Sequence, residues 1–428
     1  MMTQTDLATM YANRRERLMS QIGTGVALIG CSAGAPDPFL FDKNLAYLTG
    51  RKEKDVYLLL AAEGVVIDRW ETQTGPEVGR GRKVKTILFV RELTPREKAI
   101  DGEGAGNDEV KRATGVDAVL DVTKLDEVLG MALMEAETLW VNVGTRPSLD
   151  KALTPDIVLL NKVRERFVWI RMENIAPLIH EMRRIKEPYE VDCLREAFRI
   201  HSEIYEKIMA SLKPGDNESK GKAIWDYETG MRSKDVSGFG LDRYNANIIV
   251  AAGKNAAYGH YMDNNQEIKD GDLVLIDTGV DYKGYCSDIT RTFPANGKFT
   301  DRQKELYGIV LEAQKAAIAT MKPGSTTRAA HEAVYEVYKK HGVEKWGYGT
   351  CGHGVGLNIH DANGFRDDDD KPFVPGVVLV IEPCLFMPEE GIGIRIEDGV
   401  LIAENGCELL PGPPKEIEAV ERLCSEKK

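Results

Sequence analysis

Five acidic and imidazole side chains in the C-terminal part of the chain have the types and spacing of a metal site. They are Asp277, Asp288, His353, Glu382 and Glu397. Each lies in a segment predicted to be a buried strand or a glycine-rich turn, where unpaired charge is costly to bury. An oxygen-rich set with a single imidazole suits hard divalent ions such as manganese better than a thiolate-type zinc site would. Four carboxylates exceed what one ion needs, so we expect two ions with shared ligands and hydrolysis by a bridging hydroxide.

The segments that carry these residues belong to an internal repeat. A predicted helix that ends in Lys-Pro-Gly at 213–215 is matched by one that ends in Lys-Pro-Gly at 322–324, and a second helix follows each. Further along, GDLVLIDTG at 271–279 parallels PGVVLVIEPC at 375–384. Because both matches occur in the same order, we expect two related halves, each built from two helices and a sheet.

The repeat predicts how the carboxylates are presented. Asp277 directly follows the apolar run LVLI, and Asp288 lies on the next predicted strand. In the second half, Glu382 ends a strand at the position that matches Asp277, and Glu397 lies on the strand that follows. His353 adds the one imidazole from the glycine-rich segment GTCGHGVGLNIHD. Two ions roughly 3.5–4 Å apart would fit between two such hairpins.

Three further residues are candidates for contact with a substrate. Period-two alternation in GIGIRIED puts Arg395 on the same face as Glu397, where it would orient a carboxylate ligand, hold a substrate group or form a structural salt bridge. His260 precedes the first metal-bearing strand, and His360 lies seven residues after His353. Either imidazole could donate a hydrogen bond to a tetrahedral intermediate or a substrate carbonyl. The remaining histidines are predicted to be structural, packing or surface residues: His180, His201, His331 and His341.

Composition narrows the class of protein. The net charge of −12 argues against nucleic acid and anionic membranes as partners. The N-terminus lacks the apolar core of a signal peptide, and no stretch approaches the roughly 18 apolar residues of a membrane span. Seven cysteines without a CxxC pair fit thiols in a reducing compartment. We therefore expect a cytoplasmic protein.

The chain is long enough for more than one domain. Strand-like segments such as VYLLLAA and TILFVREL alternate with helix-like segments in the first part, which predicts a smaller α/β domain at residues 1–174. This domain lacks a phosphate loop and a dinucleotide fingerprint, so we expect it to be structural or substrate-shaping. A helix is predicted from about Pro155 into Met172. Residues 175–428 would form the second domain, and the fold class is α/β (α+β).

Several segments carry a resemblance to a known family. LVLIDTGVDYKGYCSDITRTFPANGKFT, GHGVGLNIHD, IEPCLF and GIGIRIEDG resemble the metallopeptidases of the pita-bread fold. Within that superfamily the chain is most similar to the Xaa-Pro aminopeptidase (aminopeptidase P) family, with Xaa-Pro dipeptidase (prolidase) as a near relative. NLAYLTGRKEKDVYLLLA resembles the family's N-terminal domain, and LIHEMRRIKEPYEVDCLREA resembles its domain junction. The resemblance thus covers nearly the whole chain and implies a C-terminal pita-bread domain with a pseudo-two-fold repeat.

The resemblance also implies a role for each metal-site residue. Asp277 and Asp288 would bind metal, with Asp288 and Glu397 bridging two ions. His353 would bind one ion. Glu382 would be both a ligand and the general base that carries a proton to the leaving prolyl nitrogen. The implied ions are two divalent cations, with Mn²⁺ as the first choice and Co²⁺, Zn²⁺ or Fe²⁺ as alternatives.

The implied activity is removal of the N-terminal residue from peptides with proline in second position. His260 and His360 match the family's substrate-pocket histidines, and Arg395 matches the arginine of its RIED motif. The expected partners are such peptides and further copies of the chain, as a homodimer or homotetramer. Cleavage restricted to Xaa-Pro dipeptides is the main alternative, because the same metal centre serves both reactions.

Other readings of the same fold are less consistent with this sequence. Methionine aminopeptidases usually lack the large N-terminal domain. Non-catalytic or metal-free relatives lose metal ligands, whereas all five are present here. Three positions depart from the family pattern and leave the substrate preference open: Gly349, Cys384 and Phe386. Cys286, Cys351 and Cys384 each lie two residues from a metal-site residue, either as small apolar fillers or as oxidation-sensitive thiols.

Overall fold

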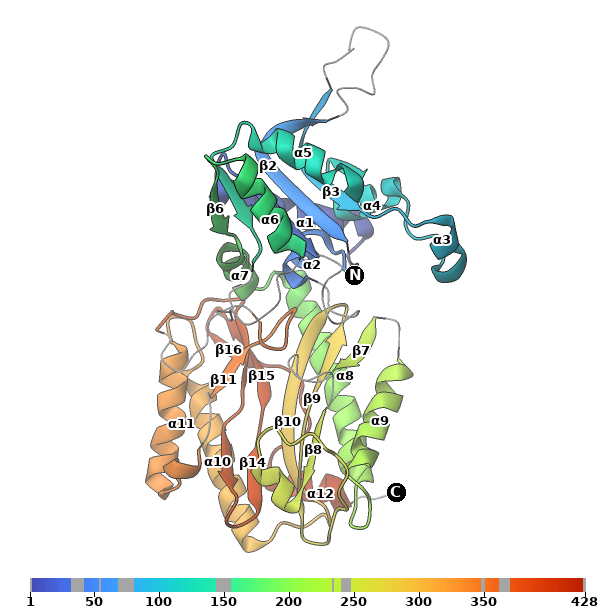
Figure 1. Ribbon diagram of the computed structural model, residues 1–428. Coiled ribbons are helices and arrows are strands. Elements are labelled where there is room, and N and C mark those ends of the chain that lie inside the picture. Colours follow the sequence, from blue (N-terminus) through green and yellow to red (C-terminus); the bar gives the residue numbers. More distant parts are fainter. Residues whose placement is uncertain are drawn as a thin grey trace. The chain divides into compact units, whose positions relative to one another are not determined.

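The computed structural model describes residues 2–31, 42–53, 55–67, 81–143, 155–232, 235–239, 248–347, 351–361 and 370–425 (Figure 1). The chain divides into two compact units, Met1–Met182 and Arg183–Lys428. The division falls within helix α7 (Ala176–Arg184), and the domain boundary before Ile175 stays a prediction. Both units mix helices and strands, which confirms the α/β class predicted from the sequence. Within the described residues, every helix is too short or too polar to cross a membrane.

The first unit is built around a six-stranded sheet in the order β4-β3-β2-β1-β5-β6. Its strands are β1 (Val26–Cys31), β2 (Val56–Ile67), β3 (Arg82–Val90), β4 (Ala118–Asp121), β5 (Thr138–Val141) and β6 (Arg171–Asn174). Its helices before α7 are α1 (Gln4–Ile22), α2 (Lys43–Thr49), α3 (Pro95–Asp101), α4 (Asn107–Thr114), α5 (Leu125–Leu133) and α6 (Pro155–Arg166). Strands β3 and β4, and likewise β5 and β6, are parallel, so each pair needs the helical crossover that lies between its members.

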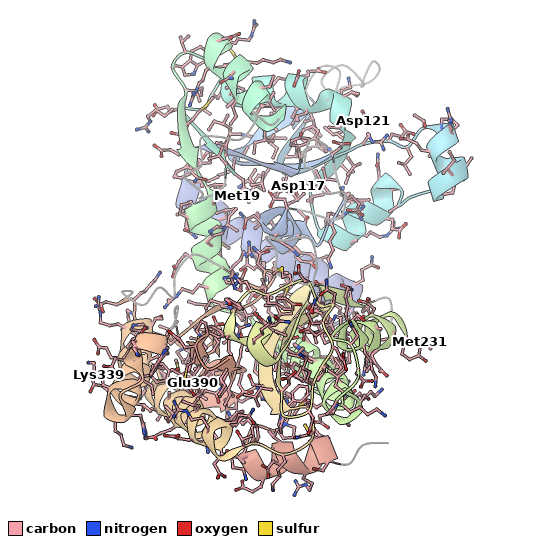
Figure 2. The ribbon with its side chains drawn as sticks, turned by 60° about the horizontal axis from the view of Figure 1, so that its bottom comes forward. Met19, Asp117, Asp121, Met231, Lys339 and Glu390 are labelled. Atoms are coloured by element: carbon pink, nitrogen blue, oxygen red, sulfur yellow. The ribbon has the colours of Figure 1, made fainter. Side chains whose placement is uncertain are left out.

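Two aspartates flank strand β4, and a buried arginine joins three helices of this unit. Asp117 and Asp121, labelled in Figure 2, lie at the two ends of β4. Asp117 accepts hydrogen bonds of 2.9 Å from the backbone N–H groups of Lys85 and Thr86 in the middle of β3. Arg15 on α1 is fully buried and donates to the carbonyls at the C-terminal ends of α2 and α4, where helices leave acceptors without partners.

One prediction for the first unit is wrong. The helix predicted to run into Met172 ends at Arg166, and the segment that follows forms strand β6. The backbone of β6 pairs along the otherwise open edge of β5, from Thr138 opposite Arg171 to Val141 opposite Asn174. Satisfying the hydrogen-bonding groups of that edge outweighs the local helical preference of the segment.

The second unit repeats one arrangement of elements. Its helices are α8 (Pro188–Ser211), α9 (Ser219–Gly230), α10 (Asp301–Thr320), α11 (Thr327–His341) and α12 (Ile417–Ser425). Strands follow the pair α8–α9 and again follow the pair α10–α11, as the sequence repeat predicts. Figure 1 shows the two helix pairs, green and orange, on opposite flanks of the strands.

The first half contributes one long hairpin. The strands of this half are β7 (Val236–Phe239), β8 (Ile249–Ala252), β9 (Leu273–Tyr282) and β10 (Tyr285–Pro294), and β9 and β10 form the hairpin. β9 pairs with the other three, and all ten residues of β10 are buried. Asp277 lies opposite Thr290, and Asp288 lies opposite Gly279. The two aspartates are therefore diagonal neighbours on one face of the hairpin.

The second half contributes a hairpin that is interrupted. The strands of this half are β11 (Gly352–Gly354), β12 (Val378–Ile381), β13 (Cys384–Met387), β14 (Ile392–Arg395), β15 (Asp398–Ala403) and β16 (Gly406–Leu409). One arm of the hairpin consists of β12 and β13, and the other of β14 and β15. β12 pairs with β15 up to Ile381 opposite Asp398, and β13 pairs with β14 from Cys384 opposite Arg395. Residues 382–383 and 396–397 lie between these two ladders. We call these four residues the hairpin break, and Pro383 within it has no N–H to give to a ladder.

Candidate metal centre

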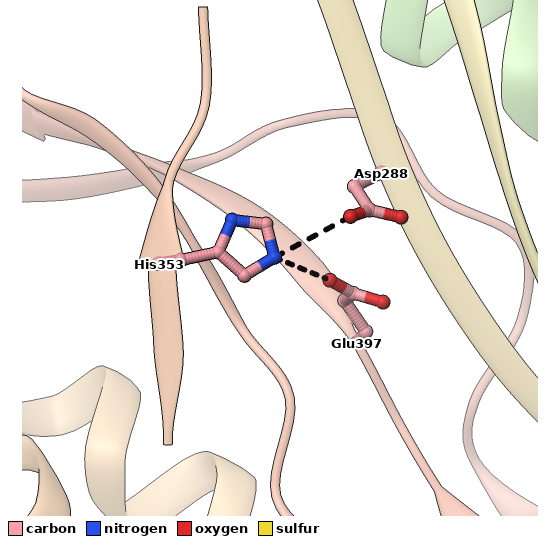
Figure 3. A group of neighbouring side chains, drawn as sticks. All are labelled: Asp288, His353 and Glu397. Carbon is pink, nitrogen blue, oxygen red and sulfur yellow. Dashed lines mark ion pairs between the residues drawn. The ribbon is translucent and has the colours of Figure 1, made fainter. Parts of the chain in front are cut away.

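Three of the five predicted metal-site residues converge from separate elements of the second unit. Asp288 comes from β10, His353 from β11 and Glu397 from the hairpin break (Figure 3). One ligand atom from each lies within 4.8 Å of those of the other two. The Nε2 atom of His353 is 3.4 Å from Asp288 Oδ2 and 4.0 Å from Glu397 Oε1. This spacing leaves room for a small cation among the three side chains.

The other two predicted residues lie beside this group. Glu382, also in the hairpin break, has its Oε1 atom 3.7 Å from His353 Nε2. Asp277 is the diagonal neighbour of Asp288 on the first hairpin, and Arg395 forms an ion pair with its carboxylate. The structure therefore brings all five residues together, and their assignment as ligands stays a prediction.

The break directs its two glutamates away from their own ladder. The backbone N–H of Glu382 donates to the carbonyl of Cys351, at 2.8 Å, and that of Glu397 donates to the carbonyl of Thr290, at 3.0 Å. These bonds join the second hairpin to the segment before His353 and to β10. The local sequence with Pro383 thus ends one ladder, and the neighbouring segments satisfy the N–H groups that it releases.

The carboxylates repel one another in a desolvated site. Burial raises the pKa of Asp288 well above its usual range, and the charges of Asp277 and Glu382 raise it further. Burial likewise raises the pKa of Glu397, with Asp288 and Glu382 adding to the effect. Among the described residues, Asp288 Oδ1 and Glu397 Oε1 find no hydrogen-bond partner. Anionic oxygens buried without partners need positive charge, so this donor set fits divalent cations.

His353 is oriented toward the carboxylates. Its Nδ1 atom is 3.2 Å from the carbonyl oxygen of Gly354, which accepts a hydrogen bond from an N–H at that nitrogen. Nε2 then keeps its lone pair for the carboxylate side, the arrangement typical of a metal-ligating histidine. The ring of His360 stacks on that of His353 with centroids 3.9 Å apart and planes inclined by 10°.

Arg395 links the site to its surroundings. Its Nε donates to Thr290 Oγ1 at 3.0 Å, and its Nη1 donates to the carbonyl of Gly259 at 3.4 Å. Thr290 in turn donates to Glu397 Oε2 at 2.7 Å. Arg395 therefore holds Asp277 directly, and it reaches Glu397 through the hydroxyl of Thr290. Its contact with Gly259 also steadies the residue that precedes His260.

Comparison with known proteins places this geometry in a family. Residues 192–404 match the model of "Metallopeptidase family M24", and residues 11–140 match "Aminopeptidase P, N-terminal domain". The chain is 32% identical over 440 residues to "Intermediate cleaving peptidase 55, mitochondrial" of Arabidopsis thaliana, covering 96% of this chain and 82% of that protein. The chain belongs to metallopeptidase family M24. The family resemblance found in the sequence is thereby confirmed.

Other known proteins are similar over nearly their full length. The chain is 30% identical over 460 residues to "Xaa-Pro aminopeptidase" of Escherichia coli, covering 96% of this chain and 97% of that protein. A solved structure described as a putative aminopeptidase P from Bacillus anthracis superposes with a TM-score of 0.85 at 27% identity, covering 98% of this chain and 99% of that one. M24 membership implies divalent metal ions, and the cluster of Asp288, His353 and Glu397 is a candidate site for them.

Two residues that help to build this M24 site escaped the sequence analysis. His201 on α8 is fully buried, with Nδ1 2.9 Å from Ser287 Oγ and Nε2 2.7 Å from Thr278 Oγ1. Both hydroxyls belong to neighbours of predicted ligands, so His201 joins the two strands of the first hairpin from behind. Only its position on an amphipathic helix is visible in the sequence, and that position predicts packing alone.

Glu218 is the second of these residues. It is fully buried and accepts hydrogen bonds from the N–H groups of Ala252 and Gln266, at 2.8 and 2.9 Å, and from the hydroxyl of Tyr261, at 2.8 Å. These bonds fix the loop that carries His260. Its partners lie more than thirty residues away along the chain, so no local pattern indicates the role.

The remaining predicted positions surround the M24 site. His260 and His360 are exposed, and the ring of Phe386 packs below Gly259. Cys286, Cys351 and Cys384 are buried thiols, and their effect on the site stays a prediction. Gly349, where a departure from the family pattern was noted, lies outside the described residues.

Proposed function

We propose that this chain is a metal-dependent aminopeptidase that removes the N-terminal residue from peptides with proline in second position. Family M24 membership and the full-length similarity to a Xaa-Pro aminopeptidase support a metallo-exopeptidase. The observation that carries the proposal is the close grouping of two buried carboxylates and a partly buried histidine, with Glu382 within 3.7 Å of the shared imidazole. A catalytically inert relative would have no need for this costly concentration of charge.

The metal-site residues would hold two divalent ions. The five are Asp277, Asp288, His353, Glu382 and Glu397. Asp288 and Glu397 would be shared by the two ions, as the family resemblance implies, and each is buried with one oxygen that lacks a partner among the described residues. The bound ions would activate water as a nucleophile at neutral pH and act as Lewis acids toward the carbonyl oxygen. We propose Mn²⁺ as the native ion, with Co²⁺, Zn²⁺ and Fe²⁺ as alternatives.

Glu382 is assigned as the general base. Burial raises its pKa, while the charges of His353 and Arg395 act in the opposite direction. Its side chain remains 21% exposed, so solvent reaches it. A carboxylate with a raised pKa accepts a proton from water and returns it to the prolyl nitrogen as that nitrogen leaves.

The exposed imidazoles of His260 and His360 would stabilise charge on the substrate. Either ring can donate a hydrogen bond to the carbonyl oxygen as negative charge develops there. Arg395 is assigned to hold Asp277 and the loop before His260 in place.

Selectivity for proline has a physical basis. The Xaa-Pro bond is a tertiary amide without an N–H, so a site that binds a substrate through that N–H cannot bind it. Assembly as a homodimer or homotetramer and a cytoplasmic location are part of this proposal.

A peptide panel tests the proposal. The chain would be treated with a chelator, reloaded with Mn²⁺ and given a Xaa-Pro-Yaa peptide, the matched Xaa-Ala-Yaa peptide and a Xaa-Pro dipeptide. We expect release of the first residue from Xaa-Pro-Yaa alone or fastest, with no turnover before reloading. Cleavage of the dipeptide only would replace the aminopeptidase by a dipeptidase. Equal cleavage of the alanine peptide would refute the proline requirement.

A further inference from the structure

A buried polar cluster, which the proposed chemistry does not use, contacts the backbone of the hairpin break. It consists of Arg291 on β10, Gln314 on α10, Asp398 at the start of β15 and Lys415 in the C-terminal segment. We call these four residues the clamp. Arg291, Gln314 and Asp398 are 1%, 0% and 4% exposed, and the side chain of Lys415 is 17% exposed. Three formal charges and an amide are thus gathered where apolar packing would be less costly.

The clamp binds the backbone of the break. Arg291 Nη1 donates to the carbonyl of Glu397 at 2.6 Å. Gln314 Nε2 donates to the carbonyls of Ile396 and Ile381, at 3.0 and 3.3 Å. These carbonyls belong to Glu397 itself, to the residue before it and to the residue before Glu382. The backbone that presents both glutamates is therefore fixed by two side chains from other elements.

Asp398 and Lys415 hold those two side chains in position. Asp398 accepts from Arg291 Nη2 at 2.5 Å and from Gln314 Nε2 at 3.1 Å. Lys415 Nζ donates to Asp398 Oδ2 at 2.6 Å and to Gln314 Oε1 at 2.9 Å. The contact with Oε1 sets the orientation of the Gln314 amide, so that its nitrogen faces the break. Lys415 thus determines which end of Gln314 meets the two carbonyls.

The C-terminal segment closes the cluster. The carbonyl of Pro413 accepts from Arg291 Nη2 at 2.7 Å, two residues before Lys415. The carbonyl of Pro383 accepts from the N–H of Ile396 within the break, at 3.4 Å, whereas the buried carbonyls of Ile396 and Glu397 find their donors in the clamp. The segment after β16 supplies one lysine and two carbonyls, those of Pro413 and Pro414, to the clamp.

We propose that Lys415 and the C-terminal segment around it are positioning elements of the metal centre, which act through Asp398 and Gln314 to fix the carboxylates of Glu382 and Glu397. The inference rests on the proposed function only in that these two glutamates are taken as metal ligands. Groups that orient ligands from behind control metal affinity, and their removal weakens it about 10- to 100-fold. A cluster that served stability alone would change the unfolding transition and leave metal affinity as it is.

Calorimetric titration of the metal-free chain with Mn²⁺ distinguishes these roles. Lys415→Met keeps the aliphatic stem and leaves Asp398 paired with Arg291, so the fold should persist, which urea unfolding checks. We expect Mn²⁺ to bind the variant about 10- to 100-fold more weakly than the wild type. Lys415→Arg should recover most of the affinity. The matched control is Lys315→Met, which removes an exposed ion pair of 2.8 Å with Glu416, the residue next to Lys415.

A second variant guards against loss of folding. Gln314→Met is of similar size and removes the donors to the Ile381 and Ile396 carbonyls, and it should weaken Mn²⁺ binding to a similar extent. Wild-type affinity in both folded variants would overturn the inference while the proposed function stands. An equal loss of affinity in the Lys315→Met control would also overturn it. Absence of Mn²⁺ binding by the wild-type chain would overturn the metal centre and the inference together.

Discussion

The buried histidine behind the first hairpin predicts a specific dependence of stability on pH. Burial lowers the pKa of His201 well below 6.5, and the nearby charge of Arg291 lowers it further. Both ring nitrogens are hydrogen-bonded to hydroxyls, so the folded state holds the neutral ring. In the unfolded chain the same imidazole takes up a proton near pH 6.5. Unfolding therefore binds a proton below that pH.

The sign and size of the effect follow from linkage. Because the folded pKa is depressed, the stability contributed by neutral His201 is present above pH 6.5 and is lost as the pH falls. One proton taken up on unfolding changes the free energy of unfolding by about 1.4 kcal/mol per pH unit. Between pH 6.5 and pH 5 the second unit should lose about 2 kcal/mol from this residue.

Urea unfolding at several pH values measures this loss. Tryptophan fluorescence is a suitable signal, since Trp225 is buried with its ring 5.1 Å from that of His201. His201→Gln keeps a hydrogen-bonding side chain and should remove about 1.4 kcal/mol per pH unit from the slope below pH 6.5. His341→Gln, at an exposed histidine beside Glu312, is the control for the loss of a histidine, and its slope should differ from that of His201→Gln. An unchanged slope in His201→Gln would refute the assignment of a buried neutral ring.

Two further variants test the site, and a third tests a buried ion-pair cluster elsewhere in the second unit. Glu382→Gln should lower kcat by about 10²- to 10⁴-fold, because it removes the general base, and calorimetry would measure separately how much Mn²⁺ affinity is lost with this proposed ligand. Arg395→Lys keeps the charge but loses the planar fork, so kcat should fall about 10- to 100-fold with little change in the urea midpoint, and unchanged kinetics would contradict its positioning role. Asp361 is buried between Arg183 and Lys186; burial would raise its pKa, but the two cations outweigh burial and lower it. The stability that ionised Asp361 contributes is therefore present above pH 3.8 and lost on acidification. Asp361→Asn should lower the free energy of unfolding at pH 7 by about 3–5 kcal/mol.

The carboxylates could be predicted because local sequence determines where they lie. Asp277 follows a run of apolar residues that must form a buried strand, and the repeat gives Glu382 the equivalent position. Alternation along β14 likewise places Arg395 toward the site, where it pairs with Asp277. The structure brings these residues together as the pattern indicates.

The supporting contacts could not be predicted, since they join residues far apart in the chain. Thr290 and Glu397, joined by a hydrogen bond, are 107 residues apart, and no pattern in either segment indicates the pairing. The hairpin break could not be predicted because apolar residues alternate in the same way along an interrupted hairpin and along a continuous one. The strand β6 was missed for a related reason, because the free edge of β5 decided its conformation.

Counting bound metal tests the central claim most directly. The chain and its Glu397→Gln variant would be stripped with chelator, equilibrated with Mn²⁺ and analysed for metal per chain by plasma mass spectrometry after removal of unbound ions. The proposed site predicts two Mn²⁺ per wild-type chain and fewer than two in the variant, since Glu397 is assigned as a bridging ligand. One ion or none in the wild type, or an unchanged count in the variant, would contradict the two-metal centre.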